Sequence, residues 1–179
     1  MTTVAVVLAS GSGDNTIKLW RMWDNTEITT LTGHSNEVTS VTFNHNGTIL
    51  ASCSGDNTIK LWGMSDYVKI TTLTGHSNDV LSVAFNPDGS ILASGSDDNT
   101  IKLWRMSDNR EIATLTGHTS DVYSVAFNKD GSILASGAAK DTIKLWRMSD
   151  YTLLNTLTGG GADMTHGWHM NVAKVAWRP

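Results

Sequence analysis

The chain has 179 residues, a formal net charge of −4, and charged residues at only 17% of its positions. This weakly acidic balance argues against a nucleic-acid binder that acts through bulk positive charge. Cys53 is the single cysteine, so no disulfide can form within the chain, and the apolar run at residues 4–9 is too short for a signal peptide or a membrane span. We therefore expect a cytoplasmic protein whose partners are neither nucleic acids nor membranes.

The chain opens with three predicted strands; the first matches the later segment from Ile91 to Ser96, and in the other two β-branched and polar residues alternate. The first extends from Val6 to Ser12, the second reads TIKLW and ends at Trp20, and the third reads EITTLTG and ends at Gly33. Gly, Asn and Asp separate these segments, as is typical of turns. The sequence thus predicts three consecutive strands before the first complete unit.

Three longer units follow, and each opens with a Val-x-Ser-Val-x-Phe strand. These strands lie at residues 38–43, 80–85 and 122–127, and each is followed by an Asn-Gly or Asp-Gly pair. Such a pair between two apolar segments is the strongest short-range signal for a β-hairpin. Each unit is therefore predicted to begin with a hairpin and to continue with two more strands.

The last part of the chain departs from this pattern. After Gly159 an insertion at residues 160–170 delays the next unit. The segment from Val172 to Trp177 then repeats the first-strand pattern, with Trp177 at the position of Phe85. The chain thus supplies second, third and fourth strands at its start and a single first strand at its end, and we expect these two parts to form one unit together.

The units repeat with a fixed period. Trp20, Trp62, Trp104 and Trp146 recur every 42 residues, and Gly-His pairs at 33–34, 75–76 and 117–118 keep the same step. A period in the low forties, with Gly-His at the start and Trp near the end, is typical of a four-stranded propeller blade. The chain resembles the WD-repeat (WD40) β-propeller family over nearly all of its length. The resemblance implies an all-β fold, a β-propeller of four-stranded antiparallel blades.

We expect residues 1–179 to form one propeller domain with four blades. The predicted blade units are residues 1–33 together with 171–179, then 34–75, 76–117 and 118–159, with an insertion loop at 160–170. The blade built from both ends of the chain resembles the strand-exchange closure by which this family locks its rings.

A ring of four blades needs a turn of about 90° between neighbours, whereas a ring of eight needs only about 45°. The outer blades also carry apolar patterns, although the ends of a repeat array are normally polar. We therefore expect a homodimer that forms one eight-bladed ring. In this ring the strand from Val172 to Trp177 pairs with the strand from Val6 to Ser12 of the second chain. The alternative is a strained four-bladed monomer in which the last strand returns to its own N-terminal blade.

Each unit also repeats a His, a Ser, an Asp and a Trp. A Ser-His-Asp set is the signature of a hydrolase triad, but its repetition in every unit argues against catalysis. The resemblance implies a buried hydrogen-bonded network instead, because buried polar groups must be paired. The expected members are His34, Ser52, Asp56, Trp62, His76, Ser94, Asp98, Trp104, His118, Ser136, Asp141, Trp146, Ser10, Asp14 and Trp20. Asp141 is included because Lys140 stands at the position of Asp98 and displaces the aspartate by one residue.

The insertion contains a second candidate for chemistry. Asp163, His166 and His169 combine a His-x-x-His spacing with a carboxylate, and such residues can bind a transition metal. The alternative is a solvated loop from which one histidine joins the network of the first blade. A single short motif is a weak signal, so we expect no bound metal and no cofactor.

The resemblance implies that partners bind on the face that carries the Gly-His loops, around the central channel. Three positions in each blade contribute: the residues on either side of the first Val of the first strand, and the residue before the turn Asp. These are Glu37, Thr39, Gly55, Asp79, Leu81, Asp97, Asp121, Tyr123, Ala139, Asn171, Ala173 and Gly13. The set is acidic, with Leu81 and Tyr123 as apolar anchors of the kind found in interface hot spots.

These observations predict a non-catalytic scaffold that binds a protein or peptide partner, with a preference for basic segments. One alternative is a recently amplified or engineered repeat protein that has no evolved ligand. The other is a hydrolase or a metal-dependent enzyme that uses the Ser-His-Asp set or the insertion.

Overall fold

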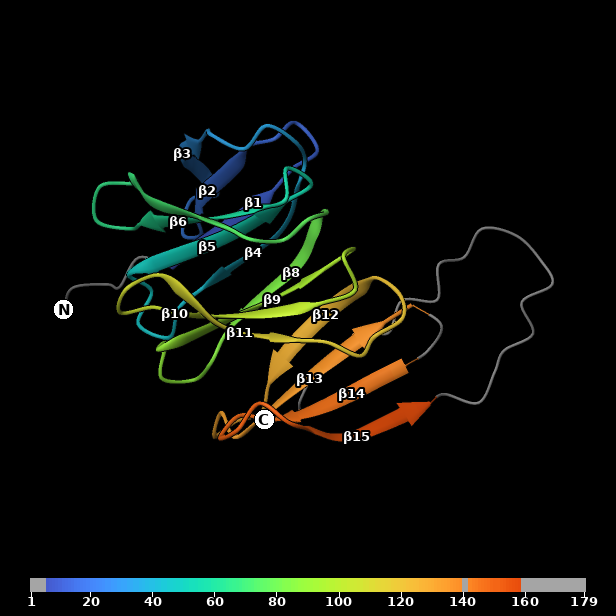
Figure 1. The fold of residues 1–179 in the computed structure, drawn as a ribbon. Helices are drawn as coiled ribbons and strands as arrows, with labels where there is room; N and C mark the ends of the chain where they lie inside the picture. Colours follow the sequence, from blue (N-terminus) through green and yellow to red (C-terminus); the bar gives the residue numbers. More distant parts are fainter. Residues whose placement is uncertain (1–5, 140–141, 159–179) are drawn as a thin grey trace.

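The computed structural model of the protein describes residues 6–139 and 142–158. Every regular element in these ranges is a β-strand, and the strands form four antiparallel sheets, here called blades 1 to 4 (Figure 1). No helix with the length and apolar character needed to cross a membrane occurs in the described part of the chain. The all-β, antiparallel fold predicted from the sequence is confirmed.

The blades follow one another along the chain. Blade 1 contains the strands β1 (Val7–Gly11), β2 (Ile17–Arg21) and β3 (Thr26–Leu31). Blade 2 contains β4 (Val38–Phe43), β5 (Ile49–Ser54), β6 (Thr58–Gly63) and β7 (Lys69–Thr74). Blade 3 contains β8 (Val80–Phe85), β9 (Ile91–Ser96), β10 (Ile101–Arg105) and β11 (Arg110–Leu115). Blade 4 contains β12 (Val122–Phe127), β13 (Ile133–Ala138), β14 (Thr142–Arg147) and β15 (Leu153–Thr158). The strand predicted between Val172 and Trp177, and with it the strand exchange, lies outside the described residues.

The hairpins form where the Asn-Gly and Asp-Gly pairs predict them. Between β8 and β9, Gly89 has φ +73° and its amide donates to the carbonyl of Asn86 at 3.0 Å. A left-handed backbone of this kind costs glycine little because glycine has no Cβ. The side chain of Asp88 accepts a hydrogen bond from the amide of Ser90 at 2.8 Å, which closes the turn. The same geometry recurs in blades 2 and 4, with glycines at φ +69° and +74°.

The hydrophobic core lies between the blades. Successive side chains of a strand point to opposite faces of its sheet, so each blade has two apolar faces. One face, called here the Ile-Leu-Leu face, turns toward the following blade; its residues in blade 3 are Ile101, Leu103 and Leu115. The other, called the Val-Leu-Trp face, turns toward the preceding blade; its residues in blade 4 are Val122, Leu134 and Trp146.

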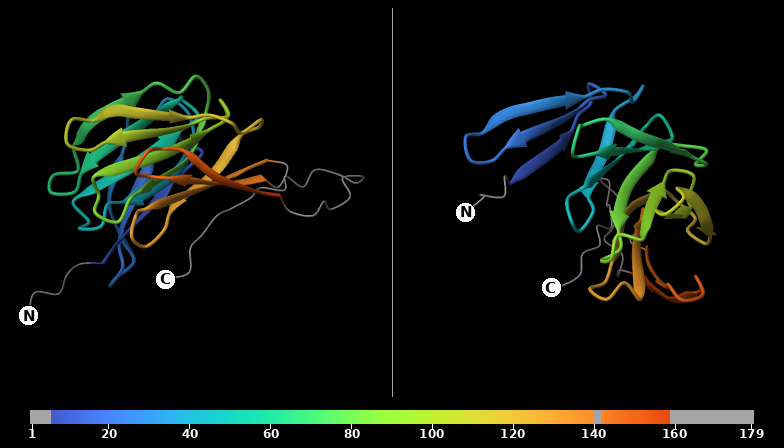
Figure 2. Two further views of the ribbon diagram at one scale, coloured as in Figure 1. Left: turned by 60° about the horizontal axis from the view of Figure 1, so that its bottom comes forward. Right: turned by 90° about the vertical axis from the view of Figure 1, so that its left-hand side faces the viewer.

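These two faces meet at three junctions. The core clusters between blades 1 and 2, between 2 and 3 and between 3 and 4 use the same six positions, and all of these residues are buried. In the first cluster the residues are Ile17, Leu19, Leu31, Val38, Leu50 and Trp62, and in the second they are Ile59, Leu61, Leu73, Val80, Leu92 and Trp104. The four blades stack in an arc with blades 1 and 4 at its two ends (Figure 2).

Candidate functional site

The polar residues repeated in each unit meet inside blade 3. His76 precedes β8, Ser94 lies in β9, and Asp98 lies in the turn that follows. The His76 ring places Nδ1 2.7 Å from Asp98 Oδ2 and Nε2 2.8 Å from Ser94 Oγ. The indole Nε1 of Trp104 donates to the same Ser94 Oγ at 2.9 Å. One hydrogen-bonded chain thus joins the loop, the turn and two strands of the blade.

Blade 2 carries the same arrangement. His34 contacts Asp56 Oδ2 and Ser52 Oγ, each at 2.8 Å, and Trp62 Nε1 donates to Ser52 Oγ at 2.9 Å. Ser52 and its counterpart in blade 3, Ser94, are both fully buried, at 0% exposure. Because a catalytic nucleophile must reach its substrate, a serine enclosed in this way offers no attacking oxygen. The distances match those of a catalytic triad, but a substrate cannot reach the serine.

The charges in this network follow from burial and hydrogen bonding. Burial of the His76 ring lowers its pKa and outweighs the opposing effect of Asp98, so the imidazole is neutral at pH 7. Burial opposes the ionisation of Asp56, but hydrogen bonds from Thr58, the Ser35 amide and His34 outweigh it and lower the pKa of Asp56 to about 2. A neutral ring facing an ionised carboxylate donates from Nδ1 and accepts from the serine at Nε2.

Blades 4 and 1 contain only part of the network. His118 contacts Ser136 Oγ at 2.7 Å, and Trp146 donates to this oxygen at 2.8 Å. The His118 Nδ1 is buried with no hydrogen-bond partner among the described residues, and burial and Lys144 lower its pKa to about 4. Asp141, the predicted partner, lies outside the described residues.

In blade 1, Trp20 donates to Ser10 Oγ at 2.9 Å. Asp14 lies at the surface and accepts hydrogen bonds from the amide and the hydroxyl of Thr16, at 3.0 and 2.7 Å. No histidine of the described residues reaches Ser10, so the network of this blade is incomplete there.

The positions predicted to bind a partner come together at one end of each blade. The amide of Asp97, directly after β9, donates to the carbonyl of Asp79, directly before β8, at 3.0 Å. Equivalent bonds join Gly55 to Glu37 and Ala139 to Asp121, each at 3.1 Å. Two predicted positions are therefore adjacent in each of blades 2, 3 and 4. Asn171 and Ala173 lie outside the described residues.

Between blades 3 and 4 this arrangement gathers carboxylates. One oxygen of Asp97 is buried and has no hydrogen-bond partner among the described residues. Burial, reinforced by the nearby charges of Asp121, Asp79 and Asp98, raises the pKa of Asp97 to about 6. The hydroxyl of Tyr123 donates to Asp121 Oδ2 at 3.1 Å. This group of Asp79, Asp97, Asp121 and Tyr123 is called the acidic edge below.

Thr39 belongs to the same set but faces the interior. Its hydroxyl lies against the carbonyl oxygen of Val80 in the next blade and 3.1 Å from that of Cys53. The Thr39 side chain therefore links blades 2 and 3, and its hydroxyl is engaged within the protein. Leu81 and Tyr123, the predicted apolar anchors, are half-buried.

No group of three or more metal-ligating side chains occurs within residues 6–139 and 142–158. The weak metal candidates Asp163, His166 and His169 lie outside the described residues.

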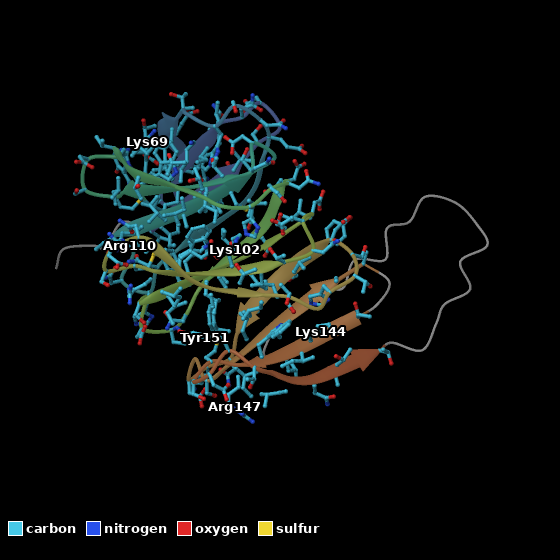
Figure 3. The ribbon with its side chains drawn as sticks, in the orientation of Figure 1. Lys69, Lys102, Arg110, Lys144, Arg147 and Tyr151 are labelled. Atoms are coloured by element: carbon cyan, nitrogen blue, oxygen red, sulfur yellow. The ribbon has the colours of Figure 1, made fainter. Side chains whose placement is uncertain are left out.

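Two tyrosines were missed by the sequence analysis. Tyr67 and Tyr151 have φ +60° in the loops before β7 and β15, where blades 1 and 3 have Asn25 and Asn109 at φ +57° and +58°. Asparagine tolerates this backbone far better than tyrosine. Tyr67 packs against the core between blades 1 and 2. Tyr151 packs against the core between blades 3 and 4, and Figure 3 labels it there. The signal was present in the sequence as an alternation of Asn and Tyr at one repeat position.

A protein-family model matches the chain in four segments that follow the 42-residue repeat. The family described as WD domain, G-beta repeat matches residues 3–21, 25–63, 67–105 and 109–147. The matched segments define four WD-type repeats, and the chain belongs to this family. None of the curated proteins compared with the chain matches it. Proteins with WD repeats are typically protein-interaction scaffolds and are generally not catalysts.

Proposed function

We propose that this chain is a non-catalytic, cytoplasmic scaffold that binds a basic peptide segment of a partner protein at the acidic edge. The observation that carries the proposal is the buried oxygen of Asp97, which has no hydrogen-bond partner among the described residues. Burial and the nearby charges of Asp121 and Asp79 also raise the pKa of Asp97. Like charges held together in a partly buried place repel each other. A lysine or arginine of a partner would relieve this repulsion and supply the missing hydrogen-bond donor.

The chemistry of the edge supports a peptide rather than a metal or a small anion. Carboxylates from two neighbouring blades lie within electrostatic reach of one another, and Leu81 and Tyr123 offer apolar contact close to them. Complementary charge mainly raises the association rate and the specificity of binding, and salt screens it. Binding is therefore expected to weaken as the salt concentration rises.

The proposal excludes a hydrolase role for the Ser-His-Asp sets. Ser52 and Ser94 are enclosed within their blades and accept a tryptophan N–H, so neither offers an oxygen to a substrate. The sets instead hold the Gly-His loops in place, and these loops carry the face that presents the acidic edge.

The test is peptide selection by the double variant Asp79→Lys with Asp121→Lys, using a library of basic, neutral and acidic peptides. The matched control is Asp88→Lys with Asp130→Lys, in the hairpin loops at the opposite end of the same two blades. Each Asp→Lys change adds two charges, so both variants have a formal net charge of 0 in place of −4. We expect the first variant to lose basic peptides and the control to retain them.

Retention of basic peptides by the first variant would contradict the proposal. Failure of the unmodified chain to select any peptide would favour the alternative of an amplified or engineered repeat protein without an evolved ligand.

The proposal includes the assembly of the scaffold. We propose an eight-bladed ring of two chains, closed by pairing between the strand from Val172 to Trp177 and the strand from Val6 to Ser12 of the second chain. Supporting this, the blades at the two ends of the arc carry the same repeat as the inner blades. Closure through the same contacts would let a ring form without open ends.

A further inference from the structure

Among the described residues, nothing covers the outermost face of blade 4 as its counterparts in the other blades are covered. In blades 1, 2 and 3 the fourth-strand leucine of the Ile-Leu-Leu face is 3–4% exposed. The equivalent Leu157, in β15 at the free end of the arc, is 44% exposed (Figure 1). Ile143 and Leu145 are half-buried, whereas Ile101 and Leu103 are fully buried. The residue types are the same, so the difference comes from the neighbour that blade 4 lacks among the described residues.

Blade 1, at the other end of the arc, has exposed residues on its opposite face. Leu8 occupies the position of Leu50, Leu92 and Leu134, which are each 0% exposed, but Leu8 is 50% exposed. Trp20 is half-buried, while the three other repeat tryptophans are 2–3% exposed. The Val-Leu-Trp face of blade 1 is therefore open in the described part of the chain.

We propose that the open Ile-Leu-Leu face of blade 4 binds the open Val-Leu-Trp face of blade 1 of a second copy of this chain. The contact repeats five of the six positions of the junction that the chain already forms three times, namely Ile143, Leu145 and Leu157 of blade 4 and Leu8 and Trp20 of blade 1. Each of those junctions joins an Ile-Leu-Leu face to a Val-Leu-Trp face, and none joins two faces of one kind. The chain thus carries both halves of the interface, one at each end.

The three existing junctions indicate how the new one is built. The junctions that precede blades 2 and 4 contain Tyr67 and Tyr151, and the junction that precedes blade 3 has Asn109 at this position. A second copy would bring Asn25 to the new junction. The order Tyr, Asn, Tyr along one chain therefore continues with Asn at the contact between chains, as it would in an uninterrupted array.

At the junction that has Asn109 in place of a tyrosine, one apolar residue at the edge stays exposed. Ile70, beside the junction between blades 2 and 3, is 51% exposed, and Leu154 has the same position in blade 4. Leu157 instead corresponds to Leu73, which is 3% exposed at that junction. Leu157 is therefore the residue whose environment should change most when the second copy binds.

The inference deepens the proposed two-chain ring and rests on it only for the number of chains. The described part of this contact uses β1, β2, β13, β14 and β15, and the first-strand valine of the other junctions has no counterpart in the described part of blade 1. Exposed apolar faces of this kind normally mark an interaction site. Because the contact is head-to-tail, it either closes into a ring or extends into an open series.

The test compares three single variants of the full chain by light scattering after gel filtration. Leu157→Glu places a charge on the open face of blade 4, and Leu8→Glu places one on the open face of blade 1. The control is Leu153→Glu in the same strand as Leu157 and equally exposed, at 45%. Leu153 has the repeat position of Glu27 and Glu111, which form ion pairs with Lys18 and Lys102, so two other blades already carry a glutamate there.

We expect the unmodified chain and Leu153→Glu to have twice the 19.3 kDa mass of one chain. Leu157→Glu and Leu8→Glu should each fall to the mass of one chain at micromolar concentration, with unchanged circular dichroism. An equimolar mixture of these two variants should regain the two-chain mass, because one junction then joins two unmodified faces.

Three results would overturn the inference: a folded unmodified chain at 19.3 kDa, an unchanged mass for Leu157→Glu, or dissociation by Leu157→Glu but not by Leu8→Glu. The last result would indicate two blade 4 faces in contact. Masses that rise with concentration beyond two chains, and that both variants abolish, would support the face contact but contradict the closed ring.

Discussion

Replacement of His76 by alanine tests the role of the network most directly, because the chain contains its own control. His76 and His118 are almost equally buried, at 8% and 7% exposure. Both form edge contacts with a tryptophan, at ring-centroid distances of 6.4 and 6.3 Å. They differ at Nδ1, which contacts Asp98 at 2.7 Å in His76 and has no described partner in His118. The two substitutions therefore remove similar volumes but different polar contacts.

The magnitudes follow from those contacts. His76→Ala removes one hydrogen bond to a charged carboxylate and one to a buried hydroxyl, and we expect it to lower the free energy of unfolding by about 2–3 kcal/mol. The loss is not larger because Asp98 keeps the amide and hydroxyl of Thr100 as donors. His118→Ala removes the hydroxyl contact and also an unpaired buried nitrogen, so we expect a loss of only about 1 kcal/mol.

Urea denaturation followed by tryptophan fluorescence measures both losses at pH 7. The two variants need equal denaturant slopes for the comparison to hold, since a changed slope indicates a change in the unfolding transition itself. A loss for His118→Ala that equals or exceeds that for His76→Ala would refute the reasoning. It would mean that the contact with Asp98 contributes nothing to the stability of the blade.

Two further predictions concern single positions. The pKa of Asp97 is raised from 3.8 to about 6 in the folded state, so the folded state binds the proton more tightly and stability falls as the pH rises through this range. Asp97→Asn should therefore raise the melting temperature above pH 6 and change it little below pH 4; equal shifts at both would contradict this. Gly95→Ala should destabilise the fold by about 1–3 kcal/mol, because its Cβ would lie 2.7 Å from Val122 Cγ1 and 2.9 Å from the Val122 carbonyl oxygen. Gly13→Ala, with nothing within 4 Å of the added carbon, is the control, and similar melting curves for both variants would show that the junction has room.

The strands and the blades could be predicted because they depend on local chemistry. The step of 42 residues fixes corresponding positions, and alternating side chains with Asn-Gly or Asp-Gly pairs mark the hairpins. The first strands at 38–43, 80–85 and 122–127 match the structure residue for residue. The meeting of His76, Ser94 and Trp104 was implied by the resemblance to WD-repeat propellers, and it agrees with the need of buried polar groups for partners.

The sequence by itself thus predicted the repeats and the strands of the described blades. Only the tertiary structure decided which residues at the same repeat position differ in burial and in neighbouring charge. Leu115 and Leu157 hold one repeat position, yet Leu115 is 4% exposed and Leu157 is 44% exposed. Likewise burial, together with the charge of Asp121 in the next blade, raises the pKa of Asp97. Burial and charge repulsion depend on the neighbouring blade, and a residue's place in the repeat does not specify whether that neighbour is present or what it carries.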